Sequence, residues 1–81
     1  MATVYILKSA KDGRRYIGST DNLERRLNQH EQGQVTSTKF RRPLTLIYQE
    51  QFANIGEARQ REKFFKTHKG YNELAKLITG L

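Results

Sequence analysis

The chain has 81 residues, with 15 lysines and arginines against 8 acidic residues and no cysteine, so its formal net charge is +7. A chain this short makes one domain with a small core, and without cysteine neither disulfides nor a thiolate metal site can support that core. It has no apolar run that could span a bilayer and no apolar signal-peptide region at its N-terminus. We therefore expect one soluble cytoplasmic domain over residues 1–81, with no membrane partner.

The first predicted element is an antiparallel hairpin of residues 3–8 and 15–19, because Asp12-Gly13 lies between two β-prone runs. Tyr5 and Tyr16 share a face if the loop has an even number of residues, centred near Ala10-Lys11 or on Asp12-Gly13. The first loop would set the two tyrosines directly opposite, the second would offset them by several residues, and a three-residue loop would separate their faces. From hairpin position alone, core packing explains both tyrosines better than chemistry does.

A first helix should follow, with Thr20 or Asp21 as its N-cap, Leu23 and Leu27 toward the core, and Gly33 as its C-terminal stop. Residues 34–42 predict a surface loop that Pro43 closes, and residues 44–52 predict a third strand covered on both sides.

A second helix should begin near Asn54 and end before Gly70, because Ile55, Ala58, Glu62 and Phe65 recur on one stripe. A last amphipathic helix is predicted over residues 71–81, with Asn72 as a possible cap and a stripe of Leu74, Leu77, Ile78 and Leu81. The predicted order is therefore β-β-α-β-α-α.

Three side chains stand out as candidates for chemistry. Arg26 and His30 are four residues apart on one helical face and could converge with the tyrosines, although such a pair by itself is usually solvated. Glu62 lies on an apolar stripe, where ionisation is costly without a cation. An ion pair with an arginine and a hard-metal site such as Mg²⁺ are equally compatible with that position.

The tyrosines need help if either is to act as a base. A phenol with a pKa near 10 is mostly protonated at pH 7, and a nearby arginine or metal charge would lower that pKa.

The ordered set of Tyr5, Tyr16-Ile17-Gly18, Arg26, His30 and Glu62 resembles the motifs of the GIY-YIG nuclease family. Residues 19–30 are similar to the family's continuation after its second motif, and residues 61–66 resemble its metal-ligand helix. The likeness covers nearly the whole chain. It is nearest to small stand-alone bacterial members, related to homing endonucleases and to the nuclease domain of the protein that makes the incisions in excision repair. The first motif departs from its name, since Thr3-Val4-Tyr5 stands where Gly-Ile-Tyr is expected.

This resemblance implies an α+β fold with a small, mainly antiparallel three-stranded sheet flanked by helices. It also implies one-metal phosphodiester hydrolysis, with DNA favoured over RNA, and suggests a place in DNA repair. The resemblance implies that Tyr5 is the general base for water and that Tyr16 orients the water or shares that task. It implies that Arg26 stabilises the charge on the phosphate and that His30 assists proton handling or binds phosphate. Glu62 would hold Mg²⁺ or Mn²⁺. Gly18 would permit close backbone approach. Asn72 would be a further family asparagine or the cap of the last helix, and we favour the cap.

Basic residues near the hairpin, the first helix and the following loop suggest a path for the nucleic acid, against a generally solvated cationic surface: Arg14, Arg15, Arg25, Lys39, Arg41 and Arg42. Hydroxyls of Thr36, Ser37 and Thr38 could donate to phosphates. No element is typical of a base-reading helix, so we expect selection by DNA structure, with a protein partner as one source of specificity. Two alternatives stay open: a nucleic-acid-binding module of the same fold that cleaves little, and an interaction protein whose last helix docks a partner.

Overall fold

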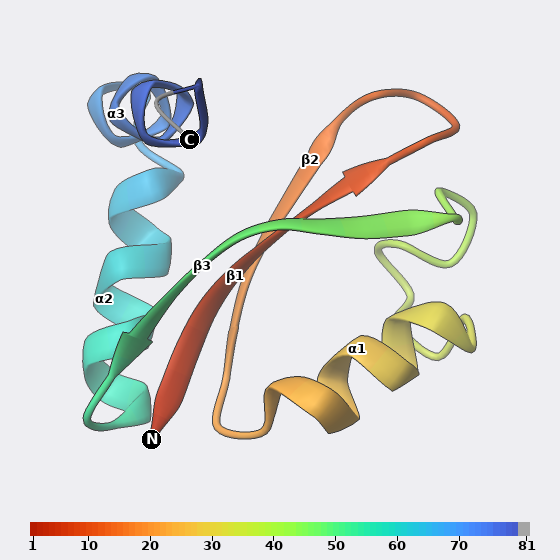
Figure 1. The fold of residues 1–81 in the computed structure, drawn as a ribbon, viewed down its shortest axis with the longest axis horizontal. Helices are drawn as coiled ribbons and strands as arrows, with labels where there is room; N and C mark the ends of the chain where they lie inside the picture. Colours follow the sequence, from red (N-terminus) through yellow and green to blue (C-terminus); the bar gives the residue numbers. More distant parts are fainter. Residues whose placement is uncertain (80–81) are drawn as a thin grey trace.

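The structure is a computed structural model that describes residues 1–79 (Figure 1). Its elements are β1 (Ala2–Ser9), β2 (Arg15–Thr20), α1 (Leu23–Glu31), β3 (Leu44–Phe52), α2 (Ile55–Phe65) and α3 (His68–Thr79). The strand order is β2-β1-β3, and both pairs are antiparallel. This confirms the predicted α+β fold and its element order. Leu81, placed above on the stripe of the last helix, lies outside the described residues.

The hairpin register puts Tyr5 opposite Gly18 and Leu7 opposite Tyr16. Tyr5 and Tyr16 therefore share a face, as an even loop requires, but they are offset by two residues. The turn is centred between Lys11 and Asp12, so both loop centres considered above were wrong. The reason is local: the Ser9 carbonyl accepts from the Gly13 N–H at 2.9 Å, and Gly13 takes a positive φ of 71° that suits glycine.

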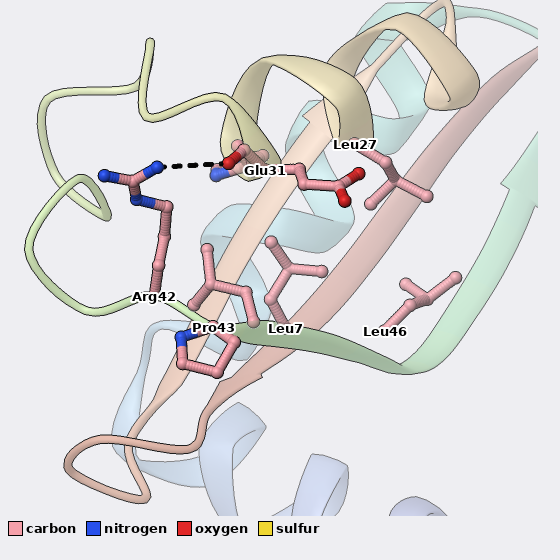
Figure 2. A pocket seen from close by; sticks show the side chains of 8 residues that line it. Leu7, Leu27, Glu31, Arg42, Pro43 and Leu46 are labelled. Carbon is pink, nitrogen blue, oxygen red and sulfur yellow. Dashed lines mark hydrogen bonds between the residues drawn. The ribbon is translucent and has the colours of Figure 1, made fainter.

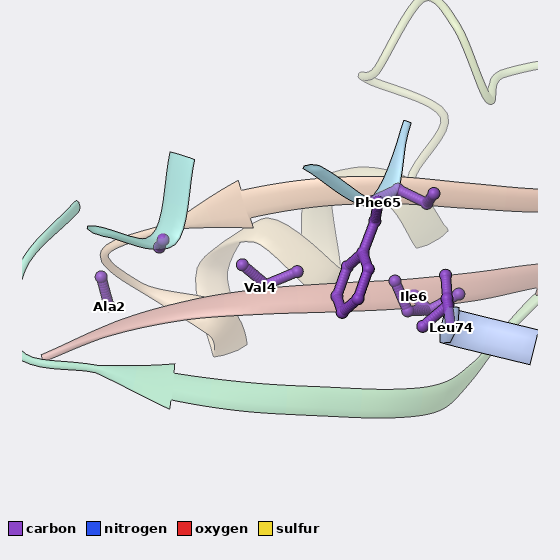
Figure 3. Packing of buried hydrophobic residues seen from close by; sticks show 7 residues of the cluster. Ala2, Val4, Ile6, Phe65 and Leu74 are labelled. Atoms are coloured by element: carbon purple, nitrogen blue, oxygen red, sulfur yellow. The ribbon is translucent and has the colours of Figure 1, made fainter. Parts of the chain in front are cut away.

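The two faces of the sheet have different covers. Val4 and Ile6 point to the face on which Ala58 of α2, Phe65 of α2 and Leu74 of α3 pack, and all five side chains are fully buried (Figure 3). Full burial contributes roughly 1.5–3 kcal/mol for each large apolar side chain. The opposite face, which carries the two tyrosines, is turned toward α1 (Figure 1).

A bulge in β3 lets its apolar run serve both faces. Ile6 is opposite Tyr48 while Leu7 is opposite Leu46, so Ile47 is the extra residue. Ile47 and Tyr48 pack against the core cluster, whereas Leu46 lies on the α1 side. The predicted covering is therefore confirmed on the core face, whereas on the α1 face Leu44 and Leu46 line a hollow and no residue of β3 is fully buried.

The start of α1 differs from the prediction. Asn22, not Thr20 or Asp21, is the N-cap, and its side chain accepts from the Arg25 N–H at 3.1 Å. The Thr20 hydroxyl instead accepts from the Asn22 N–H at 3.1 Å and so helps to orient the capping residue. Gly33 follows the helix with a positive φ of 76°, as predicted for a C-terminal stop.

The boundary between the last two helices was also predicted wrongly. α2 ends at Phe65, and α3 begins at His68, with the Thr67 hydroxyl accepting from the Gly70 N–H at 3.0 Å. Gly70 is not a helix stop. It lies in the first turn of α3, where an added Cβ would be 1.7 Å from the Phe64 carbonyl oxygen. Asn72 is an exposed residue inside α3 and caps nothing.

The apolar side of α3 belongs to the core of the domain. Leu74 is fully buried, and Leu77 and Ile78 pack against the core cluster. This burial contradicts the alternative in which these residues dock a partner. Among residues 1–79, no helix is both long enough and apolar enough to cross a membrane.

We expect Gly70→Ala to lower the free energy of unfolding by about 2 kcal/mol or more, because its methyl group would overlap backbone that cannot move without separating α2 from α3. Chemical denaturation checks this. Asn72→Ala, two residues away on the surface of α3, is the matched control and should leave stability unchanged or slightly higher, since alanine is the better helix former. A loss of about 1 kcal/mol in that control would instead restore Asn72 as a cap.

Candidate active site

Four of the predicted residues come together on the α1 face of the sheet. The Tyr5 hydroxyl is 2.9 Å from Nε2 of His30, and Nε of Arg26 donates to the same hydroxyl at 3.3 Å. The Tyr16 ring lies edge-on to His30, with 5.0 Å between centroids, and 6.2 Å from the Tyr5 ring. A two-residue offset in the hairpin and an i, i+4 pair on α1 therefore build one cluster, which we call the tyrosine cluster: Tyr5, Tyr16, Arg26 and His30.

Gly18 makes room for this cluster. A Cβ at this position would lie 2.5 Å from the Tyr5 hydroxyl oxygen and 3.0 Å from Cε2 of Tyr16. Because Tyr5 is fully buried, its ring has nowhere to move. The structure thus gives Gly18 a packing role under Tyr5, whereas the family resemblance had implied close approach of backbone.

The hydrogen bonds through His30 form a chain in which each group donates to the next in the same direction. Arginine only donates, so with Arg26 donating to Tyr5, the phenolic O–H of Tyr5 needs an acceptor, and Nε2 of His30 supplies it. His30 then carries its proton on Nδ1, which donates to the Thr38 hydroxyl at 2.8 Å. The Thr38 hydroxyl in turn faces the Val35 carbonyl at 3.5 Å. This polar chain of Tyr5, His30 and Thr38 is buried along its whole length.

Burial shifts both titrating groups toward their neutral forms. Burial raises the pKa of Tyr5 to about 12, although the hydrogen bond from Arg26 lowers it. Burial, together with the Arg26 charge, lowers the pKa of His30 to about 4. Arg26 does lower the pKa of Tyr5, as expected of a neighbouring arginine, but desolvation by burial outweighs it and the net shift is upward.

Accessibility separates the two tyrosines. Tyr5 is 0% exposed and His30 is 1% exposed, so neither meets solvent in this conformation. Tyr16 is only half-buried and lines a hollow at the edge of β2. Within the cluster, Tyr16 and Arg26 are the side chains that face outward.

The predicted environment of Thr38, a surface loop, was wrong. Residues 36 and 37 are exposed, but Thr38 is fully buried against His30 and cannot donate to a phosphate. Val35, also buried, anchors the turn, since its carbonyl accepts from the Thr38 N–H at 3.1 Å. A single valine in a polar loop is the one signal that could have indicated this inward turn.

Glu62 lies on the other side of β2 from the tyrosine cluster. Its carboxylate accepts from the Ser19 hydroxyl at 2.5 Å and pairs with Nζ of Lys66 at 2.6 Å. Ser19 is opposite Val4, a core-facing residue, whereas its neighbour Gly18 is opposite Tyr5. Among the described residues Glu62 makes no hydrogen bond or ion pair with the tyrosine cluster. The compensating cation is a lysine rather than one of the arginines, and sequence reasoning missed both Ser19 and Lys66.

Two hollows flank the edge of β2 and lead toward Glu62. One includes Arg26 and Ser19 in its lining, together with Arg25 and Arg59. The other includes Tyr16 and Lys66. Because Ser19 and Lys66 each hold one oxygen of Glu62, the carboxylate lies between the two hollows, and the edge of β2 connects it to the outward-facing part of the tyrosine cluster.

Glu62 fits a hard divalent cation only as a single ligand. Residues 1–79 contain no group of three or more His, Cys, Asp and Glu side chains that could hold a metal. One carboxylate suffices for Mg²⁺ or Mn²⁺ when water and a substrate phosphate complete the shell. The Lys66 ammonium occupies one carboxylate oxygen and would have to move, which its 54% exposed side chain permits.

The predicted nucleic-acid-binding residues fall into two groups. Arg41 pairs with Asp12 at 3.4 Å, and Arg42 donates to the carbonyls of Lys39 and Glu31, so both arginines hold residues 34–43 in place. The other four have charges that are more accessible. Arg14 is exposed, and Arg25 forms only an exposed pair with Asp21. Arg15 lies over the Tyr71 ring, and Lys39 lies over the Phe40 ring. Arg59, which the sequence analysis left out, joins the open group.

A third hollow, of about 510 Å³, lies between α1, the end of the loop and the start of β3 (Figure 2). Leucines dominate its wall, with Arg42 bonded to the Glu31 carbonyl at its rim. It touches His30 but lacks Tyr16 and Arg26. The candidate site is therefore the edge of β2 and not this third hollow.

We expect Thr38→Val to destabilise the protein by about 1–3 kcal/mol, because the isosteric valine leaves the buried Nδ1–H of His30 without an acceptor. Urea denaturation measures the loss. Thr38→Ser keeps the hydroxyl and should recover most of it. Equal stability of the valine variant and the parent would contradict the hydrogen-bond chain.

The depressed pKa of His30 predicts a pH dependence of stability. Its pKa is about 4 in the folded protein and about 6.5 in an unfolded chain, so the unfolded state binds more protons between these values. The contribution of neutral, buried His30 to the free energy of unfolding is complete above pH 6.5 and is lost progressively as the pH falls toward 4. Urea midpoints at pH 7 and pH 5 should differ more for the parent and a His68→Gln control than for His30→Phe. An NMR titration of His30 with a midpoint near 6.5 would contradict the assignment.

Comparison with known proteins agrees with this architecture. A UPF0213 protein of Staphylococcus saprophyticus is 43% identical over 77 residues, which cover 94% of this chain and 92% of the relative. A UPF0213 protein of Staphylococcus haemolyticus is 46% identical over 65 residues, or 79% of this chain and 78% of the relative. The solution NMR structure of a UPF0213 protein from Bacillus halodurans superimposes with a TM-score of 0.58 at 32% identity, over 95% of this chain and 85% of that one.

The model of the GIY-YIG catalytic domain matches residues 1–74, a span that includes all the elements around the tyrosine cluster and most of α3. With that match over most of its length, and with UPF0213 proteins as relatives, the chain belongs to the GIY-YIG family.

Proposed function

We propose that the protein is a metal-dependent endonuclease that hydrolyses phosphodiester bonds of DNA. The observation that carries this proposal is the tyrosine cluster, in which a charged Arg26 and an outward-facing Tyr16 lie on a buried, fully hydrogen-bonded Tyr5–His30 pair. A purely structural cluster would not need a charged guanidinium at its rim. The net charge of +7 supports a polyanionic substrate.

Within this proposal the two tyrosines have different tasks. Tyr5 was expected to be the base for water, but its complete burial and raised pKa favour a second position in a relay. Tyr16 takes the proton of the attacking water and passes its own phenolic proton to the Tyr5 oxygen, while Tyr5 gives its proton to Nε2 of His30. The two tyrosine rings are neighbours, with 6.2 Å between their centroids, which supports a transfer between them.

Arg26 would stabilise the negative charge that develops on the phosphate. Its Nε is held by Tyr5 and its Nη1 by Oε1 of Gln29 at 3.1 Å, so the guanidinium is oriented before substrate arrives. Arg25 and Arg59 line the same hollow and would attract the neighbouring phosphates.

Glu62 would hold the divalent cation, Mg²⁺ or Mn²⁺, with Ser19 fixing the orientation of the carboxylate. When bound, such an ion supplies Lewis-acid stabilisation of charge on the phosphate and leaving oxygen. Lys66 would leave Glu62 and keep its charge near the substrate.

The open cations lie on the hairpin turn, β2, α1, the loop and α2 rather than on one groove-reading element. We therefore infer selection by DNA structure rather than base sequence, with a protein partner as a further source of specificity. A place in DNA repair, and a relation to the incision protein of excision repair, stay predictions from the sequence likeness.

A cleavage panel of single-stranded, duplex, flapped and branched DNA, with RNA alongside, tests the proposal. Tyr16→Phe and Glu62→Gln should each lower the cleavage rate by about 10²–10⁴-fold, and EDTA should abolish it, because one removes the proton acceptor and the other the cation ligand. Glu57→Gln, an exposed carboxylate in the first turn of α2, is the matched control and should cut like the parent.

Two results would overturn parts of this proposal. Parental rates in folded Tyr16→Phe and Glu62→Gln proteins would remove both residues from the active site. Salt-sensitive binding without any cut product, unchanged by EDTA, would favour the second candidate, a binding module of the same fold. The observation that favours this candidate is that both oxygens of Glu62 already have partners.

A further inference from the structure

The hollow that Tyr16 lines at the edge of β2 extends to the junction of α2 and α3. This hollow of about 320 Å³ is lined by Arg15, Tyr16, Ile17, Lys66 and Tyr71. β2 is an edge strand, so no other strand covers this side. We call it the edge hollow.

Tyr71 is unusually open for a large aromatic residue. It is 46% exposed, although it lies on a helix whose other apolar side chains pack into the core. Its position is fixed: its backbone N–H donates to the Thr67 carbonyl at 2.8 Å, and the preceding Gly70 is wedged against the Phe64 carbonyl. The ring therefore projects from a fixed backbone and is a partly solvated surface that lines the edge hollow.

Two cations flank this ring. The Arg15 guanidinium carbon is 5.7 Å from the ring centroid, and Lys66 supplies a half-exposed ammonium on the other wall. An aromatic face between cations matches the two parts of a nucleotide, since bases stack on aromatic rings and phosphates pair with Lys and Arg.

We propose that the edge hollow binds one unpaired nucleotide, with its base stacked on Tyr71 and its phosphate between Arg15 and Lys66. This inference rests on the proposed function and deepens it, because Tyr16 is shared and the bound nucleotide is the neighbour of the phosphate to be cut. A base within a duplex is already stacked and paired, so the edge hollow selects DNA that offers an unpaired nucleotide.

Phe40 is the competing aromatic residue. It is 75% exposed, and Lys39 lies 5.3 Å from its ring centroid. It lines none of the hollows described above. Phe40 thus lacks the enclosing walls that Tyr71 has, and it serves as the matched control.

The test is equilibrium binding of a short single-stranded oligonucleotide containing 2-aminopurine, in EDTA so that no cleavage occurs. Tyr71→Leu should weaken binding by about 5- to 100-fold and lessen the quenching of 2-aminopurine, since the stacking surface is lost. Tyr71→Phe and Phe40→Leu should bind like the parent. Duplex of equal length should bind Tyr71→Leu and the parent alike.

Two results would overturn the proposal: parental binding of the single strand by Tyr71→Leu, or an equal loss on single strand and duplex. Because the measurement needs no metal and no cut product, its outcome is independent of whether the protein proves to be a nuclease.

Discussion

The buried hydrogen-bond chain of Tyr5, His30 and Thr38 is the interaction on which the rest of the site depends. It joins β1, α1 and the loop that follows α1 on that face of the sheet. Unpaired polar groups in such a place would be costly, so each member fixes the next. The outward-facing Tyr16 and Arg26 take their positions from this chain, because one packs on His30 and the other bonds to Tyr5.

The same burial makes the inner groups of the tyrosine cluster neutral and leaves the charge on its outer side. Desolvation raises the pKa of Tyr5 and lowers the pKa of His30, so the buried pair is neutral and only Arg26 brings charge to the cluster. The buried pair does not meet solvent directly, so in the proposed relay Tyr16 would be the group that meets water.

Sequence periodicity could predict what depends on local spacing. Hairpin parity placed Tyr5 and Tyr16 on one face, and the i, i+4 rule placed Arg26 and His30 together. It could not predict what depends on tertiary contact. Thr38 is indistinguishable from its exposed neighbours until the loop folds inward. Gly70 has the sequence signature of a helix stop, although its lack of a side chain serves the contact between two helices.

The segment from Tyr16 to Ser19 decides where a substrate can lie. Successive residues of a strand point to opposite faces, so Gly18 makes room for Tyr5 on one side while Ser19 holds Glu62 on the other. A phosphate that reaches both Arg26 and a cation on Glu62 must therefore pass along the edge of β2 rather than across a face of the sheet. An unpaired strand edge is usually a liability for aggregation, and Arg15 and the flanking hollows place cations there. In the proposed nuclease, the open edge is where the two halves of the site would act on one substrate.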